Sequence, residues 1–211
     1  MSQLCTLHSV YEQPLSQTPD ATMLIQEDQH ISYLQFDQLV QDTQAWLAEQ
    51  GVKTGTHVAV WLINRVEWLA IFFALARLGA TLVAVNTKYR SHEVHYILTN
   101  SHASFLILQL NFRKIDFAEV VQGIDASTLT KLKKIIVVDP DDQTPMRLLE
   151  RPVLHFVPRL AQGTHAKNRQ PNHTQSPELE DLPVIFFTTS GTTKGPKLVV
   201  HTQKTLSEHV R

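Results

Sequence analysis

The stretch that decides the fold is VAVWLINRVEWLAIFFALARLGATLVAV, residues 58–85. It contains two short apolar runs, residues 58–61 and 81–85, separated by a segment that is rich in aromatic and aliphatic side chains and ends at Gly79. Residues 58–61 predict a short strand and residues 65–78 a helix, and the β-branched run at 81–85 lacks polar alternation, which predicts a strand buried on both faces. A strand, a helix and a second strand at this spacing predict a right-handed βαβ unit with parallel strands.

The same alternation continues on both sides of this unit. Before it, an apolar stripe over residues 36–47 predicts an amphipathic helix, with Ser32 as its N-cap and Gly51 at its end. After it, we expect helices near residues 91–99 and 112–121, and strands at residues 105–108, 135–138 and 184–187. The sequence therefore predicts an α/β fold with a mainly parallel sheet flanked by helices.

Shifts in composition divide the chain into four segments. Residues 1–28 carry Pro14 and Pro19 and are expected to be an irregular lead-in, whereas residues 29–161 form the α/β subdomain. Residues 162–181 are rich in Pro, Gln, Asn, His and Thr, which is typical of a linker. Residues 182–211 are expected to start a second α/β subdomain, with a strand, a loop and a helix from about Leu198.

Charge and composition exclude several classes of protein. Nineteen basic and twenty acidic residues give a formal net charge of −1, so nothing indicates a surface for nucleic acid. A single cysteine, Cys5, excludes an internal disulfide framework and suits a reducing compartment. The apolar run Trp68–Ala76 is far shorter than the roughly 20 residues of a membrane span, and the first residues do not resemble a signal peptide. We expect no membrane span and a cytoplasmic location.

One loop indicates chemistry: TTSGTTKGPK, residues 188–197, directly after an apolar run. It holds two of the seven glycines of the chain, together with five hydroxyl side chains and two lysines. Glycine allows successive backbone N–H groups to converge on an anion, and hydroxyl and ammonium groups add donors. A phosphate site is one interpretation, and an ordinary surface loop is the other. The loop is not a Walker-type P-loop, because three residues rather than four separate Gly191 from Gly195.

The order Thr-Ser-Gly-Thr-Thr, two positions, Pro-Lys resembles the signature loop of the adenylate-forming enzymes. That resemblance implies that the loop holds the β- and γ-phosphates of ATP. The implied ATP-binding residues are Thr189, Ser190, Gly191, Thr192, Thr193, Lys194, Gly195 and Lys197. The chain departs from the pattern in three places: Lys194-Gly195 reverses the usual pair, Leu198 replaces a common glycine, and Gln203 stands where the family often has a histidine.

Further landmarks extend the resemblance to acyl-CoA synthetases over most of residues 18–206. They are the segments 18–20, 31–33, 58–60, 77–90 and 92–98. The resemblance implies that a carboxylic acid and ATP give an acyl-adenylate and pyrophosphate, and that the acyl group then passes to CoA, with Mg²⁺ assisting. The adenine-binding, ribose-binding and catalytic-lysine regions of that family are absent from these 211 residues, so we assign no catalytic residue.

Two hypotheses follow for the chain as a whole. The first is an N-terminal portion of a synthetase, truncated after the phosphate loop and inactive alone, whose partner is a missing C-terminal portion. The second is a non-catalytic binding or interaction module that keeps the fold, covered for instance by a homodimer. The first hypothesis predicts an exposed apolar face around residues 184–187 and 198–206.

Two smaller signals carry less weight. His92 and His95 would share a helix face, but no Cys or carboxylate cluster completes a metal set nearby, so no metal site is expected. Ser190 follows a strand, yet Thr188 stands where a Gly-x-Ser-x-Gly nucleophile motif needs its first glycine. Acyl-enzyme chemistry at Ser190 is therefore disfavoured.

Overall fold

The structure is a computed structural model that describes residues 6–112, 114–160, 177–189 and 196–209. The helices in these ranges are α1 (Ser9–Gln17), α2 (Tyr33–Glu49), α3 (Val66–Arg77), α4 (Ser91–Asn100), α5 (Phe117–Gln122) and α6 (Gln203–His209). The strands are β1 (Thr22–Gln26), β2 (Gln29–Ser32), β3 (His57–Trp61), β4 (Thr81–Ala84), β5 (Phe105–Leu108), β6 (Lys134–Val137), β7 (Arg147–Leu148), β8 (Arg151–His155), β9 (Pro183–Thr189) and β10 (Lys197–Thr202). Short 3₁₀ turns lie at Ala126–Thr128 and Pro177–Leu179.

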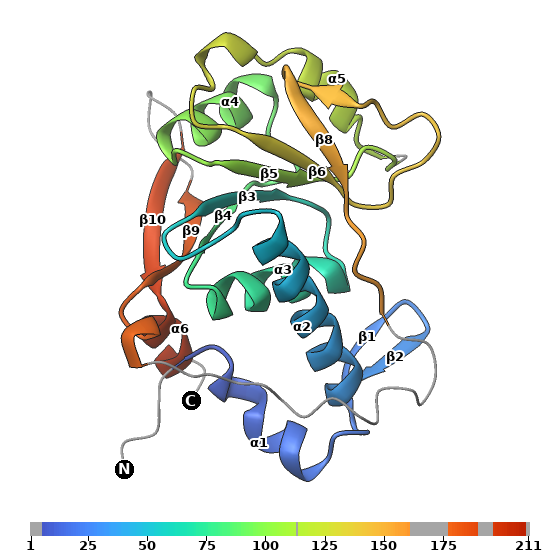
Figure 1. Ribbon diagram of the computed structural model, residues 1–211, viewed down its shortest axis with the longest axis vertical. Coiled ribbons are helices and arrows are strands. Elements are labelled where there is room, and N and C mark those ends of the chain that lie inside the picture. The colour runs from blue at the N-terminus through green and yellow to red at the C-terminus, as the bar shows by residue number, and fades with distance from the viewer. Residues whose placement is uncertain (1–5, 113, 161–176, 190–195, 210–211) are drawn as a thin grey trace.

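Eight of the strands form one sheet in the order β10-β9-β4-β3-β5-β6-β8-β7 (Figure 1). The six inner strands, from β9 to β8, pair in parallel, while β10 and β7 are antiparallel to their neighbours. The strands β1 and β2 form a separate antiparallel hairpin. The predicted mainly parallel sheet flanked by helices is confirmed.

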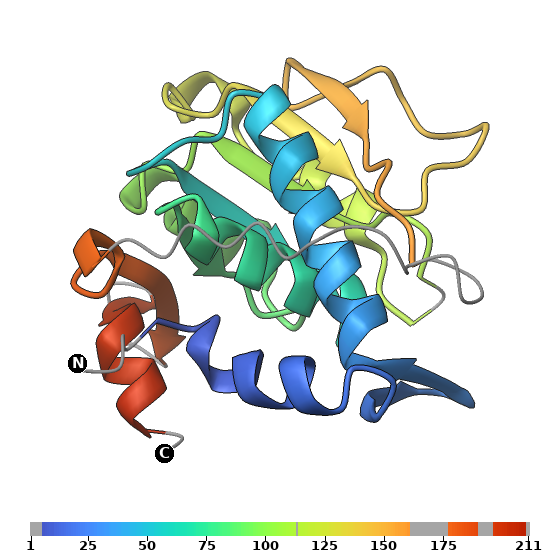
Figure 2. The same ribbon diagram turned by 60° about the horizontal axis from the view of Figure 1, so that its bottom comes forward.

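Helices cover both faces of the sheet (Figure 2), and the sheet separates two hydrophobic cores. On one face α1, α2 and α3 pack over one set of strand side chains, and on the other face α4 and α5 pack over the second set. The central strand β5 is buried along its whole length, so both of its faces contribute to a core. Continuous apolar runs such as this one are typical of strands covered on both faces.

The helix boundaries follow from local signals in the sequence. At the start of α2 the Ser32 hydroxyl accepts a hydrogen bond from Gln35 N at 3.2 Å, and the Gln35 amide oxygen accepts one from Ser32 N at 3.0 Å. After α3, Gly79 adopts φ +65°, and hydrogen bonds from Gly79 N to Ala76 O and from Ala80 N to Leu75 O close the last turn. Both predicted ends, a Ser32 N-cap and a stop at Gly79, are confirmed.

The predicted irregular lead-in differs from the observed structure. Residues 9–17 form α1 even though Pro14 lies inside it, and residues 22–26 form β1. Burial of Tyr11 and Leu15, one helical turn apart, stabilises α1 against the cost of the proline.

The C-terminal segment differs as well. The predicted helix from Leu198 is wrong over its first turn and a half, because residues 197–202 form β10 and the helix starts only at Gln203. The strand β9 pairs with β4 rather than opening a separate sheet, so the eight-stranded sheet runs across the boundary expected at residue 182. Most of the expected linker, residues 161–176, lies outside the described residues.

Candidate functional site

The β9–β10 hairpin carries both ends of the candidate phosphate loop. Because β9 runs parallel to β4, its last residue, Thr189, lies at the same edge of the sheet as the carboxyl ends of β3 and β4. Ligands of open parallel sheets bind at this edge. The antiparallel register of the hairpin places Lys197 directly opposite Thr189.

Thr189 and Lys197 are both exposed, and as a cross-strand pair they share one face of the sheet. A hydroxyl and an ammonium group held side by side offer two donors to the same oxyanion. Pro196, just before Lys197, is buried, which fixes where the chain re-enters the sheet. The other six predicted ATP-binding residues lie outside the described residues: Ser190, Gly191, Thr192, Thr193, Lys194 and Gly195.

Tyr89 anchors the first strand of the hairpin from the opposite face. Its hydroxyl donates a hydrogen bond to the Thr188 hydroxyl at 3.1 Å, and it belongs to the connection between β4 and α4. A bond from Tyr89 N to Asn86 O at 3.0 Å holds the turn that positions the ring. The end of β9 is thus tied to a second loop at the carboxyl edge, one residue before Thr189.

We expect Tyr89→Phe to loosen this anchor without unfolding the protein. Removing one hydrogen bond between partly buried hydroxyls costs about 1 kcal/mol. Urea unfolding of Tyr89→Phe, Thr188→Val and the double variant would measure the loss. If the hydroxyls act on each other, the double variant is no less stable than the worse single variant; two independent, additive losses would show that they do not.

A cavity of about 320 Å³ adjoins the hairpin. Its walls come from the segments that follow β3 and β4 and from Phe187 and Thr188 of β9. None of the described residues that line it is charged, and Asn64, Asn86 and Thr87 supply polar groups. The cavity can therefore hold an uncharged part of a ligand.

Gln203, which replaces the family histidine, is part of the framework rather than of a ligand surface. It is 3% exposed, its amide oxygen accepts a hydrogen bond from Leu7 N at 3.1 Å, and its amide nitrogen donates to Ala76 O at 2.9 Å. The start of α6 is thereby joined to the segment before α1 and to the end of α3, as their proximity in Figure 1 indicates.

Replacing Gln203 with leucine is expected to lower the free energy of unfolding by about 1–3 kcal/mol, because Leu7 N–H is left buried without its acceptor. Chemical unfolding at neutral pH measures the change. The matched control is Gln122→Leu, at an exposed position at the end of α5, which should change stability by less than about 0.5 kcal/mol. Equal losses in the free energy of unfolding for the two variants would contradict the bracing role of Gln203, which is to join α6 to the segment before α1 and to the end of α3.

The histidines His92 and His95 lie on α4 and line neither the hairpin nor its cavity. His95 is partly buried and makes a contact of 2.6 Å from its Nε2 to the Thr128 hydroxyl. Within the described ranges, no three His, Cys, Asp or Glu side chains are grouped so that they could hold a metal ion. Nor is any described helix long and apolar enough to cross a membrane. The hydrogen bond of Tyr89 was missed by the sequence analysis, because nothing local in the sequence indicates a contact with Thr188.

Comparison with known proteins gives a consistent result. The family model described as AMP-binding enzyme matches residues 11–211. The medium-chain acyl-CoA ligase ACSF2 of Danio rerio is 27% identical over 221 aligned residues, which cover 98% of this chain and 34% of the relative. The crotonobetaine/carnitine–CoA ligase of Escherichia coli is 32% identical over 178 residues, covering 83% of this chain and 31% of the relative.

Solved structures share the fold. An anthranilate CoA ligase, AuaEII, in complex with anthranoyl-AMP superimposes with a TM-score of 0.71 at 22% identity, covering 97% of this chain and 36% of that one. The N-terminal domain of FACL13 from Mycobacterium tuberculosis gives 0.68 at 24% identity, covering 94% and 44%. The chain spans about a third of the length of these two curated relatives.

Proposed function

Because the chain belongs to the AMP-binding enzyme family, we propose that it supplies the phosphate-binding part of an ATP-dependent acyl-CoA synthetase. The observation that supports this most directly is the hairpin geometry. Lys197 lies opposite Thr189 at the carboxyl edge of a parallel sheet, with the glycine- and hydroxyl-rich loop between them in the sequence. Homologues named as CoA ligases support the same activity.

In the proposed reaction a carboxylate oxygen of the acid attacks the α-phosphorus of ATP. The bond to the β-phosphate oxygen breaks, so that pyrophosphate leaves and an acyl-adenylate remains. The thiol sulfur of CoA then attacks the acyl carbonyl carbon and AMP leaves. We assign to Lys197 and the loop hydroxyls the task of binding the β- and γ-phosphates and stabilising the charge that grows on the leaving pyrophosphate.

The residues of the hairpin fit ATP better than they fit a metal. Lys197 is a cation and Thr189 a hydroxyl donor, both suited to phosphate oxygens. No described residue of the hairpin carries a carboxylate, so the described part of the hairpin offers Mg²⁺ none of its preferred side-chain ligands. When bound, Mg²⁺ would offset the negative charge of the phosphates.

The acid cannot be read from the names of the relatives, because they differ in substrate. The Danio rerio relative is named for medium-chain acids and the Escherichia coli relatives for crotonobetaine and carnitine. We propose only a small carboxylic acid, with an uncharged part that occupies the cavity of about 320 Å³ beside Thr188.

We expect these 211 residues alone to form no acyl-CoA. They correspond to about a third of each relative, and few groups remain to offset the freedom that ATP loses on binding. The assay incubates the purified chain with ATP, Mg²⁺, CoA and a panel of acids and measures the release of AMP. We expect no AMP release above that of a protein-free blank. Release above the blank would contradict the proposed inactivity.

A non-catalytic interaction module is the second candidate, and it requires a partner, for instance a second copy of the chain, over the apolar side chains that the hairpin exposes. The hairpin exposes Phe187 of β9 to 41%, and Val199 and Val200 of the edge strand β10 to 39% and 53%, which is the exposure that a truncated synthetase predicts. The apolar face expected here is only partial, since Val184 and Ile185 are buried. Sedimentation equilibrium measures whether the chain forms a homodimer, and calorimetric titration measures whether it binds ATP. A stable homodimer that binds no ATP supports the module.

A further inference from the structure

A second and larger cavity, of about 840 Å³, shares Asn64 and Trp68 with the cavity beside the hairpin but is lined by no described residue of the hairpin itself. It opens where β3, β5 and β6 end, and the end of β1 closes one side. The chain leaves β3 toward β4 on one side and later returns to β5 on the other side of β3, so this is a point where the strand order reverses. Open parallel sheets bind ligands at such points, and the volume is in the range of small-molecule sites.

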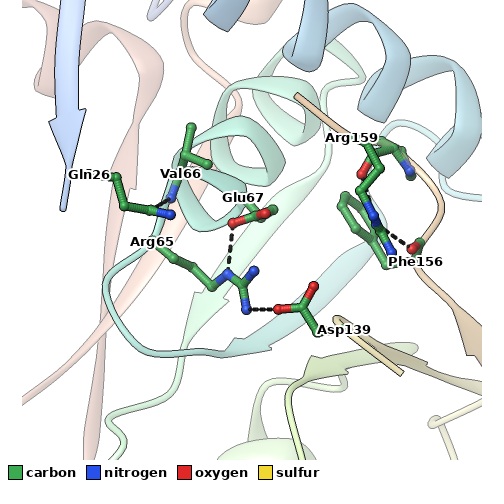
Figure 3. Close-up of polar contacts among 8 residues, drawn as sticks. Gln26, Arg65, Val66, Glu67, Asp139, Phe156 and Arg159 are labelled. Atoms are coloured by element: carbon green, nitrogen blue, oxygen red, sulfur yellow. Dashed lines mark hydrogen bonds and ion pairs between the residues drawn. The ribbon is translucent and has the colours of Figure 1, made fainter. Parts of the chain in front are cut away.

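Polar contacts hold the walls of this cavity in place. The Gln26 amide oxygen of β1 accepts a hydrogen bond from Val66 N at 2.7 Å, which caps the start of α3 from a distant strand (Figure 3). Arg65 Nε lies 2.7 Å from a Glu67 oxygen and Arg65 Nη1 lies 2.6 Å from an Asp139 oxygen. Three segments far apart in the sequence therefore meet at one fixed rim.

Apolar side chains also line the walls of this cavity. Ile25 is 59% exposed and Leu69 37% exposed, and the partly buried rings of Trp68 and Phe112 lie beside them. Exposed aliphatic side chains next to aromatic rings in a concave site favour a ligand with an apolar body.

The charge of the rim favours a cation. The charged residues among the described lining are Glu27, Arg65 and Asp139, and Arg65 is paired with two carboxylates. Burial alone would lower the pKa of Arg65, but its hydrogen bonds to Glu67 and Asp139 outweigh burial and raise that pKa. Glu27 forms no ion pair with any residue in the described part of the chain. The rim therefore has acidic charge in excess.

A buried hydrogen-bond acceptor at the wall of the cavity also favours a cationic ligand. Gln109 lies on the wall of the cavity and is 3% exposed, and its amide oxygen accepts no hydrogen bond from any described residue. A buried carbonyl oxygen without a donor is uncommon and favours a ligand that brings an N–H group. The Gln109 amide oxygen and the carboxylates of the rim would all accept a hydrogen bond from a cationic N–H group.

We propose that this cavity binds a small organic ammonium ion with an apolar or aromatic body. The ammonium group donates to the carboxylates of Glu27 and Asp139 and, after rotation of the Gln109 side-chain amide, to its oxygen, which otherwise lies beneath the cavity surface. The body packs against Ile25, Leu69 and the rings of Trp68 and Phe112, whose faces also attract a cation. No described residue of the β9–β10 hairpin lines the cavity, although Asn64 and Trp68 also line the smaller cavity beside Thr188.

Three probes of one shape and different charge test the proposal on the whole chain: 2-phenylethylammonium, 3-phenylpropionate and 2-phenylethanol. Binding is measured by titration followed by NMR. We expect the ammonium to bind at least tenfold more tightly than the carboxylate, with the alcohol in between. Equal binding of all three probes, or a preference for the carboxylate, overturns the proposal.

Variants locate the site. Gln109→Leu keeps the size of the side chain but removes the acceptor and should weaken ammonium binding by at least tenfold. Glu27→Gln and Asp139→Asn should each weaken it severalfold, while the control Asp142→Asn, an exposed carboxylate that does not line the cavity, should leave it unchanged. Thermal unfolding verifies that each variant is folded. Unchanged binding in folded Gln109→Leu and Glu27→Gln overturns the assignment to this cavity.

Discussion

Replacing Asp37 with alanine lowers the free energy of unfolding by about 3–5 kcal/mol, the largest stability loss that we expect from removing a single side chain outside the apolar core. Asp37 is 2% exposed, and its Oδ1 lies 2.5 Å from Arg77 Nη2. Without the carboxylate, the Arg77 guanidinium is left buried and unpaired, because two of its nitrogens, Nε and Nη1, already lack hydrogen-bond partners among the described residues.

The network around this ion pair explains the size of the effect. The Tyr11 hydroxyl donates to Asp37 at 2.9 Å and accepts from Arg77 at 2.7 Å, and the Gln41 amide donates to Asp37 Oδ2 at 2.7 Å. Helices α1, α2 and α3 are therefore joined at one buried point. Burial, and to a lesser degree Asp37, raises the pKa of Tyr11 above its usual range, so the phenol stays protonated.

Urea unfolding at neutral pH measures the loss, with Glu49→Ala, an exposed position on α2, as the control. Acid provides a second readout. Burial would raise the pKa of Asp37, but the Arg77 charge and three hydrogen bonds outweigh burial and lower that pKa. The contribution of Asp37 is thus complete above its unfolded pKa of about 3.9 and is lost as the pH falls through the folded value. A loss below about 1 kcal/mol in Asp37→Ala would contradict this account.

Replacing Lys197 with alanine weakens binding of pyrophosphate at least tenfold. A hydrogen bond to a charged group contributes about 1.5–3 kcal/mol, and each 1.4 kcal/mol corresponds to tenfold in affinity. Lys197 is exposed at the base of the loop, so its removal leaves the fold intact. Phosphorus NMR titration of the wild-type chain and the variant compares the two affinities.

The control for this substitution is Lys204→Ala, an exposed lysine on α6 outside the hairpin. It removes the same charge from the chain and should leave pyrophosphate binding within about twofold, since screened charges at a distance contribute little. Equal losses in Lys197→Ala and Lys204→Ala would show general charge attraction instead of a site at the hairpin.

Much of the fold could be predicted from the sequence because its strong signals are local. The apolar runs that form β3, β4, β5 and β6, and the ends of α2 and α3, follow from burial on both faces and from caps such as Ser32 and Gly79. The helix α1 could not be predicted, because its stability comes from the burial of Tyr11 against distant helices. The strand β10 was missed because its pairing with β9 decides its conformation, despite its β-branched residues.

The candidate site, too, could be predicted from the sequence only in part. The loop between Thr189 and Lys197 is visible as a cluster of glycine, hydroxyl and lysine residues, so its position after a strand could be predicted. The contact of Tyr89 with Thr188 depends on the parallel register of β4 and β9, which spans about a hundred residues of sequence and leaves no local trace. The bracing role of Gln203 is likewise set by tertiary contacts.

The most direct test of the central claim is a calorimetric titration of the wild-type chain with ATP and Mg²⁺, beside a Lys197→Ala/Thr193→Ala variant. The account predicts saturable binding with a dissociation constant on the order of 1 mM, equivalent to about −4 kcal/mol, and no measurable binding in the variant. Saturable heat that is the same in both proteins would contradict a phosphate site at this loop. Absence of heat from the wild-type chain at millimolar ATP would contradict the claim that these residues alone hold the phosphates.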